Sequence, residues 1–329
     1  MATSDAFQKS LYKYEAPWTV YSVSWSNRND KQRRIACTSF IDDYINHIQI
    51  VQLNESTDSL EKSAEIDQPY PPTKVMFMPP SLNQQNDLLM TSGDNLRIYE
   101  ISPDSSNLKC KTTLNSSTET FSPSTSFDWN TINIDRVCSC SIDTTCSVWS
   151  VETGQLVKKL IAHDKEVFDV SFAANPDIFG TVGGDGSLRM FDLRSLEHST
   201  ILYESQGLVP LLRLQWNKFD PNFIATFAMD SDKVIIIDVR QPAIPYTQLK
   251  VHRNSVNAIS WAPNKATQLC SASDDHKALI WDIAPVAEGA DPQVLQYEAE
   301  AEVNNIVWAT LYPEWVCASV GNQIQALRV

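Results

Sequence analysis

The chain has 329 residues, and 43% of them are apolar, so it is long enough to bury a large core. Its 26 lysines and arginines against 40 aspartates and glutamates give a net charge of −14, which disfavours binding to nucleic acid or anionic lipid because both need clustered cations. No apolar run approaches the roughly 18 residues of a membrane span, and the N-terminus lacks the apolar centre of a signal peptide. Seven cysteines, an odd number, favour reduced intracellular thiols.

One pattern occurs seven times along the chain. In each copy an apolar stretch ends in Trp or Phe, and further short β-rich runs follow. These aromatic anchors are spaced 43 to 52 residues apart, at Trp25, Phe77, Trp129, Phe172, Trp216, Trp261 and Trp308. A period of about 40 to 50 residues is typical of WD-repeat propeller blades with four strands each. The sequence therefore predicts an all-β fold, a seven-bladed WD-repeat β-propeller that spans residues 1–329 as a single domain.

In chain order, we predict three strands for each blade, at 19–25, 34–40 and 47–53; 73–79, 88–94 and 95–101; 124–130, 136–143 and 146–151; 165–172, 178–185 and 187–193; 210–217, 223–230 and 233–239; 255–263, 268–275 and 277–283; and 302–308, 315–321 and 323–329. The segments 54–72 and 102–122, like 194–209 and 284–301, should supply outer strands and loops, and their polar parts should be mobile. Blade seven ends with the chain and lacks a fourth strand. Because an open edge invites aggregation, we expect residues 10–16 to pair there and close the ring.

Spaced polar residues in three blades fit the buried hydrogen-bonded chain of a WD blade, in which His, Ser or Thr, Asp and Trp side chains join neighbouring strands. Blade six has His252, Ser271 or Ser273, Asp275 and Trp281; blade four has His163, Thr181 and Asp185, with Phe191 in place of Trp; and blade three has Asp143 and Trp149 without the His. Buried polar groups must be paired to be tolerated. We therefore interpret these His–Asp pairs as structural and not as acid–base catalysts.

Motifs for enzyme or metal chemistry do not occur. The sequence has no P-loop, dinucleotide-binding, nucleophile-elbow or zinc-protease motif, and it has only nine glycines. Cys138 and Cys140, with Cys146 nearby, invite a zinc interpretation, but no His or second Cys pair follows at finger spacing. We predict no catalytic residue, no cofactor and no metal. An enzyme that uses a cleft in the ring is the alternative from another class.

The residue four positions before each anchor is a second repeated feature. By resemblance to other propellers, this column lines the mouth of the central channel. Four copies are polar, at Thr73, Thr125, Asn257 and Asn304, whereas Tyr21, Phe168 and Leu212 are apolar or aromatic and have no core to enter. Exposed aromatic and aliphatic residues are favoured interface anchors. The candidates for partner binding are therefore Trp18, Tyr21, Phe168, Leu212, Asn257 and Asn304, and local loop packing is the alternative.

A four-residue x-Asp-x-Arg sequence closes blades four and five, with Phe in the first position at residues 191–194 and Ile at residues 237–240. It is similar to the W-D-x-R theme of WD-repeat substrate receptors of cullin-RING ubiquitin ligases, in which the Arg docks the ligase adaptor. The resemblance makes Arg194 and Arg240 candidates for adaptor docking. The alternative is that each Arg bonds backbone carbonyls at the end of its strand.

Longer segments resemble one WD-repeat family, among them YKYEAPWTVYSVSW (12–25), SIDTTCSVW (141–149), LIAHDKEVFDVSF (160–172), GSLRMFDLRSLEHSTILYE (186–204) and PLLRLQWNKFDPNFIATFAMD (210–230). It is the family of the DYRK-kinase-associated WD adaptor of animals, counted among the DDB-and-cullin-associated factors and including the TRANSPARENT TESTA GLABRA proteins of plants. The resemblance implies a non-catalytic scaffold of the cytoplasm and nucleus that brings kinases or transcription regulators together. The alternative is a substrate receptor of a cullin-RING ligase. The implied partners are proteins: a DYRK-type kinase, transcription regulators or a ligase adaptor.

Overall fold

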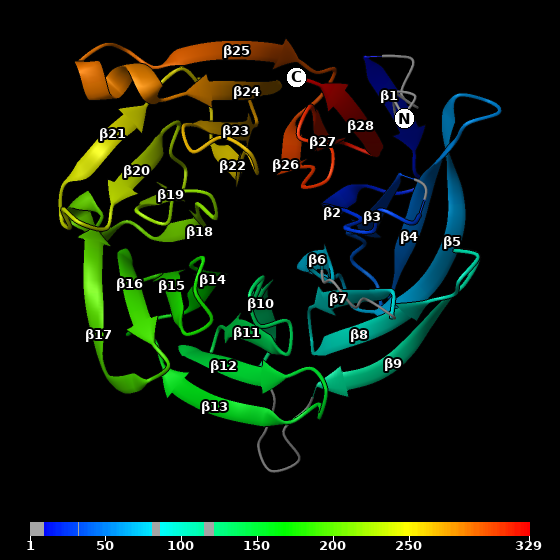
Figure 1. Cartoon of the computed structure of the whole chain (residues 1–329), viewed down its shortest axis with the longest axis horizontal. Coiled ribbons are helices and arrows are strands. Elements are labelled where there is room, and N and C mark those ends of the chain that lie inside the picture. The colour runs from blue at the N-terminus through cyan, green and yellow to red at the C-terminus, as the bar shows by residue number, and fades with distance from the viewer. Residues whose placement is uncertain (1–9, 32, 81–85, 115–121) are drawn as a thin grey trace.

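The computed structural model describes residues 10–31, 33–80, 86–114 and 122–329, and these residues form seven four-stranded antiparallel sheets arranged in a closed ring (Figure 1). Each sheet is one blade. In the first six blades the strands run in sequence from the central channel to the outer rim, and in the seventh the first strand of the described chain takes the outermost place. This arrangement confirms the predicted all-β propeller of seven blades.

The first three blades contain β2 (Val20–Trp25), β3 (Arg34–Ser39), β4 (Ile45–Asn54) and β5 (Ser59–Pro69); β6 (Lys74–Phe77), β7 (Leu88–Ser92), β8 (Leu96–Ile101) and β9 (Leu108–Leu114); and β10 (Ser124–Trp129), β11 (Arg136–Ser141), β12 (Thr145–Ser150) and β13 (Leu156–Ile161). Blades four and five contain β14 (Val167–Phe172), β15 (Ile178–Gly183), β16 (Ser187–Asp192) and β17 (Ser195–Glu204); and β18 (Leu211–Trp216), β19 (Phe223–Ala228), β20 (Val234–Asp238) and β21 (Pro245–Leu249). Blades six and seven contain β22 (Val256–Trp261), β23 (Gln268–Ser273), β24 (Lys277–Asp282) and β25 (Gln293–Glu298); and β26 (Val303–Trp308), β27 (Trp315–Val320), β28 (Gln323–Arg328) and β1 (Leu11–Glu15).

The segments between the predicted strands supply the outer edge of several blades. The region 54–72 contains the long strand β5, and the region 102–122 contains β9, while residues 115–121 lie outside the described part of the chain. Two short 3₁₀ helices, η1 (Gln206–Leu208) and η2 (Ala284–Glu288), lie in other connections. None of the described residues forms a helix with the length and apolar character that crossing a membrane would need.

The ring closes through the N-terminal strand. β1 pairs antiparallel with β28, from Leu11 opposite Leu327 to Glu15 opposite Gln323, and supplies the fourth strand of blade seven. The chain then continues directly into blade one, so the first strand of the described chain and the last one share a sheet (Figure 1). This confirms the closure predicted for residues 10–16.

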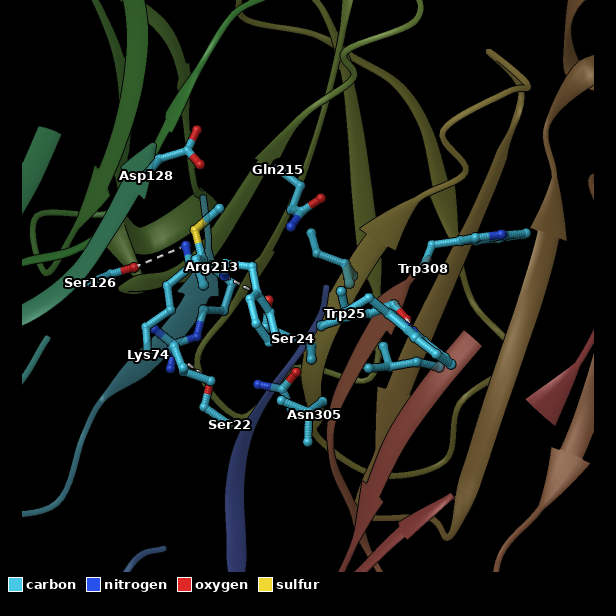
Figure 2. A pocket seen from close by; sticks show the side chains of 18 of the residues that line it. Ser22, Ser24, Trp25, Lys74, Ser126, Asp128, Arg213, Gln215, Asn305 and Trp308 are labelled. Atoms are coloured by element: carbon cyan, nitrogen blue, oxygen red, sulfur yellow. Dashed lines mark hydrogen bonds between the residues drawn. The ribbon is translucent and has the colours of Figure 1, made fainter. Parts of the chain in front are cut away.

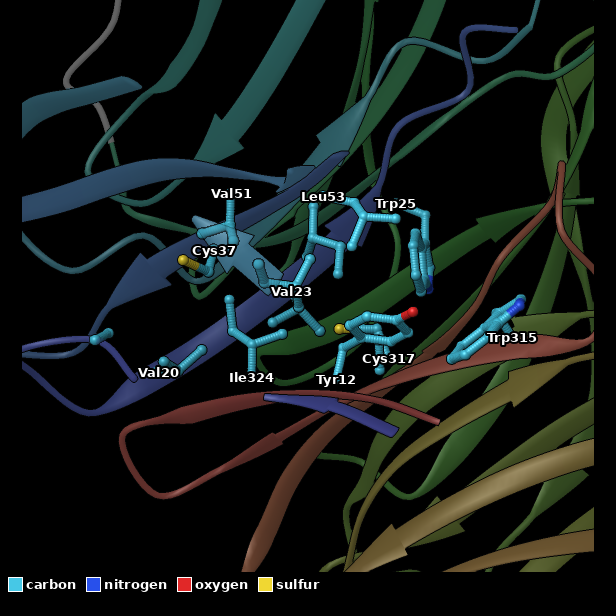
Figure 3. Close-up of a cluster of buried hydrophobic side chains, with 14 of the residues drawn as sticks. Tyr12, Val20, Val23, Trp25, Cys37, Val51, Leu53, Trp315, Cys317 and Ile324 are labelled. Atoms are coloured by element: carbon cyan, nitrogen blue, oxygen red, sulfur yellow. The ribbon is translucent and has the colours of Figure 1, made fainter. Parts of the chain in front are cut away.

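The hydrophobic core is divided among the seven interfaces between neighbouring blades, and each interface has its own buried cluster. Inner strands have neighbours on both faces, which explains why β3 and β27 are buried along their whole length, whereas the outer strand β25 is mostly exposed. The cluster between blades seven and one contains Tyr12 of β1, whose ring lies 5.8 Å from the ring of Trp315 (Figure 3). The closing strand therefore contributes to the core as well as to the sheet.

Candidate functional site

The antiparallel blades give the ring two faces with different loops. We call the face at which the innermost strands begin the mouth face; it carries the connections between blades and the turns between second and third strands. We call the opposite face the base face; it carries the loops after the innermost strands and the turns between third and fourth strands. Side chains in equivalent loops of different blades therefore lie on the same face of the protein.

The column four residues before the anchors lines the channel at the mouth face. In six blades the pairing of the innermost strand shifts register at this residue, as at Tyr21 between the paired residues Val20 and Ser22. A bulge of this kind leaves one residue unpaired and redirects its side chain. A cavity of about 350 Å³ is lined by all seven members of the column, Tyr21, Thr73, Thr125, Phe168, Leu212, Asn257 and Asn304.

The four polar members of this column hold neighbouring blades together. Each donates a side-chain hydrogen bond to a carbonyl of the next blade: Thr73 Oγ1 to Ser124 O (3.0 Å), Thr125 Oγ1 to Val167 O (2.5 Å), Asn257 Nδ2 to Val303 O (3.1 Å) and Asn304 Nδ2 to Tyr21 O (2.9 Å). The hypothesis of partner binding did not foresee this use of the two asparagine amides. Their repetition at the mouth therefore has a structural reason.

The three apolar or aromatic members have different surroundings. Tyr21 stacks on Phe40 with ring centroids 5.1 Å apart, and Phe168 is half-buried at the cavity. Leu212 packs against the core cluster between blades five and six, which corrects the expectation that it has no core to enter. Phe168 is therefore a cleaner candidate for a contact with a partner than Leu212.

Trp18 does not belong to an exposed rim. Only 8% of it is exposed, and it is part of the core cluster between blades seven and one, where it stacks on His47 at 6.2 Å between ring centroids. The connection from β1 to β2 crosses this interface, with Ala16 N bonded to Asn322 O and Val20 N to Gly321 O. That path directs Trp18 into the core, so its prediction as an exposed partner contact is wrong.

Below the mouth, the channel is lined by paired charges and small polar residues (Figure 2). The Asp169 carboxylate accepts hydrogen bonds from Ser126 Oγ (2.5 Å) and Leu214 N (2.9 Å), and Lys74 Nζ lies 3.6 Å away. Burial alone would lower the pKa of Arg213, but Asp169 and Tyr21 beside it hold that pKa above its usual value. Arg213 therefore remains a cation in the channel.

The innermost strands carry a set of inter-blade hydrogen bonds that the sequence analysis missed. Small polar side chains one or three residues before an anchor accept a backbone N–H of the next blade. The pairs are Ser22 with Val75, Ser24 with Phe77, Asp128 with Phe172, Asp169 with Leu214, Ser171 with Trp216 and Ser260 with Trp308, at 2.7 to 3.2 Å. The repeated Ser or Asp at these positions is the signal in the sequence. The carboxylates of Asp128 and Asp169 therefore help to hold neighbouring blades together.

The chain of polar groups in blade six has the expected members. Trp281 Nε1 donates to Ser271 Oγ (2.9 Å), His252 Nε2 lies 2.7 Å from the same oxygen, and His252 Nδ1 lies 3.0 Å from Asp275 Oδ2. Because the indole only donates, the serine hydroxyl can donate to Nε2, which leaves Nδ1–H to donate to the carboxylate. Burial lowers the pKa of His252 although Asp275 opposes the shift, so the imidazole is neutral near pH 7.

Blades four and three contain shorter versions of this chain. His163 binds Asp185 through Nδ1 (2.9 Å) and Thr181 through Nε2 (2.8 Å), while Phe191 stacks on Phe179 in the place of the Trp. In blade three Trp149 Nε1 donates to Ser139 Oγ (3.0 Å), and Asp143 accepts from Thr145 Oγ1 (2.6 Å). The histidines of blades four and six thus lie within blades and not at a shared cleft.

Cys138, Cys140 and Cys146 are buried free thiols in β11 and β12. Burial raises the pKa of Cys140 and Cys146 well above the usual value, which disfavours the thiolate that binds metal. Within the described ranges no group of three or more His, Cys, Asp or Glu side chains is arranged to hold a metal ion.

Arg194 and Arg240 lie at equivalent turns on the base face, opposite the mouth. Each guanidinium forms a fork with the carboxylate two residues earlier: Arg194 Nε and Nη2 with Asp192 (2.9 and 2.6 Å), and Arg240 with Asp238 (2.9 and 2.7 Å). The alternative of bonding to backbone carbonyls is therefore not what the side chains do. Their exposed fractions of 65% and 61% leave both available to a partner.

Comparisons with known proteins agree with this architecture. The family model "WD domain, G-beta repeat" matches residues 154–192 and 244–282, which contain the inner three strands of blades four and six. The ring and these repeats define a WD-repeat propeller, a non-catalytic adaptor built for protein interactions.

Similar proteins come from several organisms. The "DDB1- and CUL4-associated factor 7 homolog" of Dictyostelium discoideum is 47% identical over 323 residues, which are 98% of this chain and 99% of the relative. A WD repeat-containing protein of Saccharomyces cerevisiae is 37% identical over 311 residues, which are 83% of this chain and 58% of that protein. The chain belongs to the family of the DDB1- and CUL4-associated factor 7 homolog.

Proposed function

We propose that this protein is a substrate receptor of a cullin-RING ubiquitin ligase that binds the adaptor DDB1 through its base face and a second protein through its mouth face. The name of the Dictyostelium relative, which matches nearly the whole chain, associates that relative with DDB1 and CUL4. The observation that carries the proposal is the pair of exposed arginines at equivalent base-face turns of two neighbouring blades.

Apolar side chains accompany these arginines. Phe219, in the loop after β18, and Ile244, in the turn before β21, are both exposed on the base face of blade five. The same turn touches blade four, since Ala243 N donates to Leu202 O at 2.7 Å. We call Arg194, Phe219, Arg240 and Ile244 the base-face patch. Arginine and aromatic anchors carry most of the binding energy in protein interfaces, which favours this patch as the docking surface.

The mouth face supports the second part of the proposal. The cavity beside Phe168 offers a concave surface with an apolar wall and Arg213 as its charged member. The family resemblance supplies the partner classes for this face: a DYRK-type kinase or transcription regulators, brought together or presented to the ligase in the cytoplasm and nucleus. Scaffolding of such proteins without ubiquitin transfer is the second candidate function, and it would need the mouth face but not the base-face arginines.

Co-purification from cells followed by mass spectrometry tests the proposal. Arg194→Glu with Arg240→Glu should remove DDB1 and CUL4 from the purified material, because charge reversal at a docking arginine leaves an unpaired charge at the interface. The matched control is Arg253→Glu, an exposed arginine on the mouth face, which should retain both. Retention of DDB1 by the double variant would contradict base-face docking. If DDB1 did not co-purify with the unmodified chain, the result would favour scaffolding without ubiquitin transfer.

A further inference from the structure

A row of exposed large side chains crosses the mouth face of blade one. Phe40, Tyr44, Ile45 and Tyr70 are 52%, 73%, 56% and 45% exposed, and Tyr21 lies half-buried at the inner end. We call these five residues the blade-one aromatic surface. Clusters of large exposed aromatic side chains are uncommon on a surface without a partner, so their concentration in one blade indicates a binding surface.

The order of strands in blade one gives the row its direction. Tyr21 belongs to the innermost strand β2, Phe40 and Tyr44 flank the turn between β3 and β4, and Tyr70 follows the outermost strand β5. The rings lie in pairs: Tyr21 stacks on Phe40 at 5.1 Å, and Tyr44 meets Tyr70 edge-on at 5.8 Å. The surface therefore leads from the channel mouth to the rim of the ring.

Tyr70 is held in an unfavourable backbone conformation. Its φ of +62° lies in the left-handed region, which costs energy for a residue with a bulky side chain. An Asn or Gly would adopt this conformation at lower cost. Because the ring of Tyr70 is 45% exposed, it contributes little to the stability of the fold to offset this strain. This combination favours a role for the ring in binding.

The charges carried by the mouth-face segments of blade one are all negative, although Arg213 lies beside Tyr21 at the inner end of the row. The three mouth-face segments of blade one, residues 16–19, 39–46 and 67–73, contain Asp42, Asp43 and Asp67 and neither lysine nor arginine. Asp67 faces His47, whose Nδ1 lies 2.9 Å from Oδ1. Within the described part of the chain, Asp42 and Asp43 form no ion pair, and the carboxylate of Asp43 accepts a hydrogen bond only from the N–H of Tyr44. A partner that places cations here would meet unpaired carboxylates beside aromatic faces.

We propose that the blade-one aromatic surface binds a basic segment of a partner protein through arginine side chains. A guanidinium is planar and weakly hydrated, so it stacks on tyrosine or phenylalanine rings while its N–H groups reach carboxylates. The proposal deepens the adaptor function proposed above by naming the chemistry of the mouth-face partner, and it rests on that function for its use in the cell. Binding itself needs neither DDB1 nor the base-face patch.

Fluorescence anisotropy with a labelled hexapeptide of alternating arginine and glycine tests the proposal on the full chain. The double variant Tyr44→Ser, Tyr70→Asn should bind this peptide about tenfold more weakly, as expected when two cation–π contacts are lost. Asp42→Asn with Asp43→Asn should weaken binding severalfold. The peptide in which citrulline replaces arginine keeps its shape but not its charge, and it should not bind measurably.

The matched control removes two negative charges elsewhere on the mouth face, by Asp230→Asn and Glu302→Gln, both exposed residues of other blades. These changes should alter the affinity less than twofold at 150 mM salt. Equal weakening by the control pair would show a diffuse attraction to an acidic protein and would overturn the proposal, as would full affinity of the Tyr44, Tyr70 variant.

Two further measurements separate an effect on binding from an effect on folding and locate the bound peptide. Tyr70→Asn should raise the melting temperature, because the substitution relieves the left-handed strain, and it should weaken the peptide complex. If Tyr70 had a purely structural role, the same substitution would lower the melting temperature. In NMR spectra of the unmodified chain, the exposed Ile45 methyl should shift on addition of the arginine peptide and not of the citrulline peptide. An unshifted Ile45 methyl at saturating peptide would place the binding elsewhere and refute the assignment.

Discussion

Replacing Tyr12 by alanine should loosen the closure of the ring. The side chain is buried in β1, where it contacts Trp315 of the same blade, and its hydroxyl donates across the interface to Asp58 Oδ1 of blade one at 2.6 Å. Truncation of a buried aromatic residue removes apolar burial and leaves a cavity, which costs about 3–5 kcal/mol in protein cores. We expect the free energy of unfolding, measured in urea by tryptophan fluorescence, to fall by that amount.

Two matched variants separate the causes. Tyr12→Phe keeps the ring and loses only the hydrogen bond to Asp58, so it should cost about 1 kcal/mol. Lys13→Ala changes the next residue of the same strand, whose ion pair with Glu300 is exposed, and should cost less than about 1 kcal/mol. In Tyr12→Ala, amide protons of β28 should also exchange faster. If Tyr12→Ala were no less stable than Lys13→Ala, closure by β1 would not stabilise the ring.

Three further predictions concern other parts of the protein. His252→Ala should lower the free energy of unfolding by about 1–3 kcal/mol, because Ser271 and Asp275 lose their buried partner; an unchanged urea midpoint would refute the structural role. Burial lowers the pKa of His252 in the folded protein, so the stability contributed by the neutral imidazole should be present above pH ~6.5 and be lost as the pH falls through the folded pKa. The free energy of unfolding should therefore depend less steeply on pH below ~6.5 in His252→Gln than in the unmodified chain. An identical slope in the two proteins would contradict this prediction. One of the seven thiols, Cys110, is exposed and should react quickly with a thiol reagent in the folded protein, while rapid reaction of several thiols would show that the buried clusters open.

Much of the fold follows from local features of the sequence. The anchor of each of the seven blades is the last residue of the innermost strand, so the spacing of the anchors alone located these strands. The closing strand could be found by elimination, since blade seven ended with the chain. Because the blades repeat, the residues four positions before the anchors could be predicted to lie together, and they line one cavity. The bulge that turns these side chains inward could not be predicted from the sequence of any one blade.

The failures concern contacts between segments distant in the chain. Trp18 reads like an exposed aromatic beside a proline, and only the crossing of the blade-seven interface shows why it is buried. The acceptors Ser24 and Asp128 bind residues 44 to 53 positions later, so no local pattern reveals their partners. The blade-one aromatic surface joins side chains from Tyr21 to Tyr70 that only the order of strands in the blade brings together.

The affinity of the purified chain for purified DDB1, measured by isothermal titration calorimetry, tests the proposed function most directly. The unmodified chain should bind DDB1, Arg194→Glu with Arg240→Glu should weaken binding at least about tenfold as loss of hot-spot residues does, and Arg253→Glu on the mouth face should leave the affinity within about twofold, the small effect of a charge outside the interface. Absence of binding by the unmodified chain, or equal affinity of the double variant, would contradict a ligase receptor that docks through its base face.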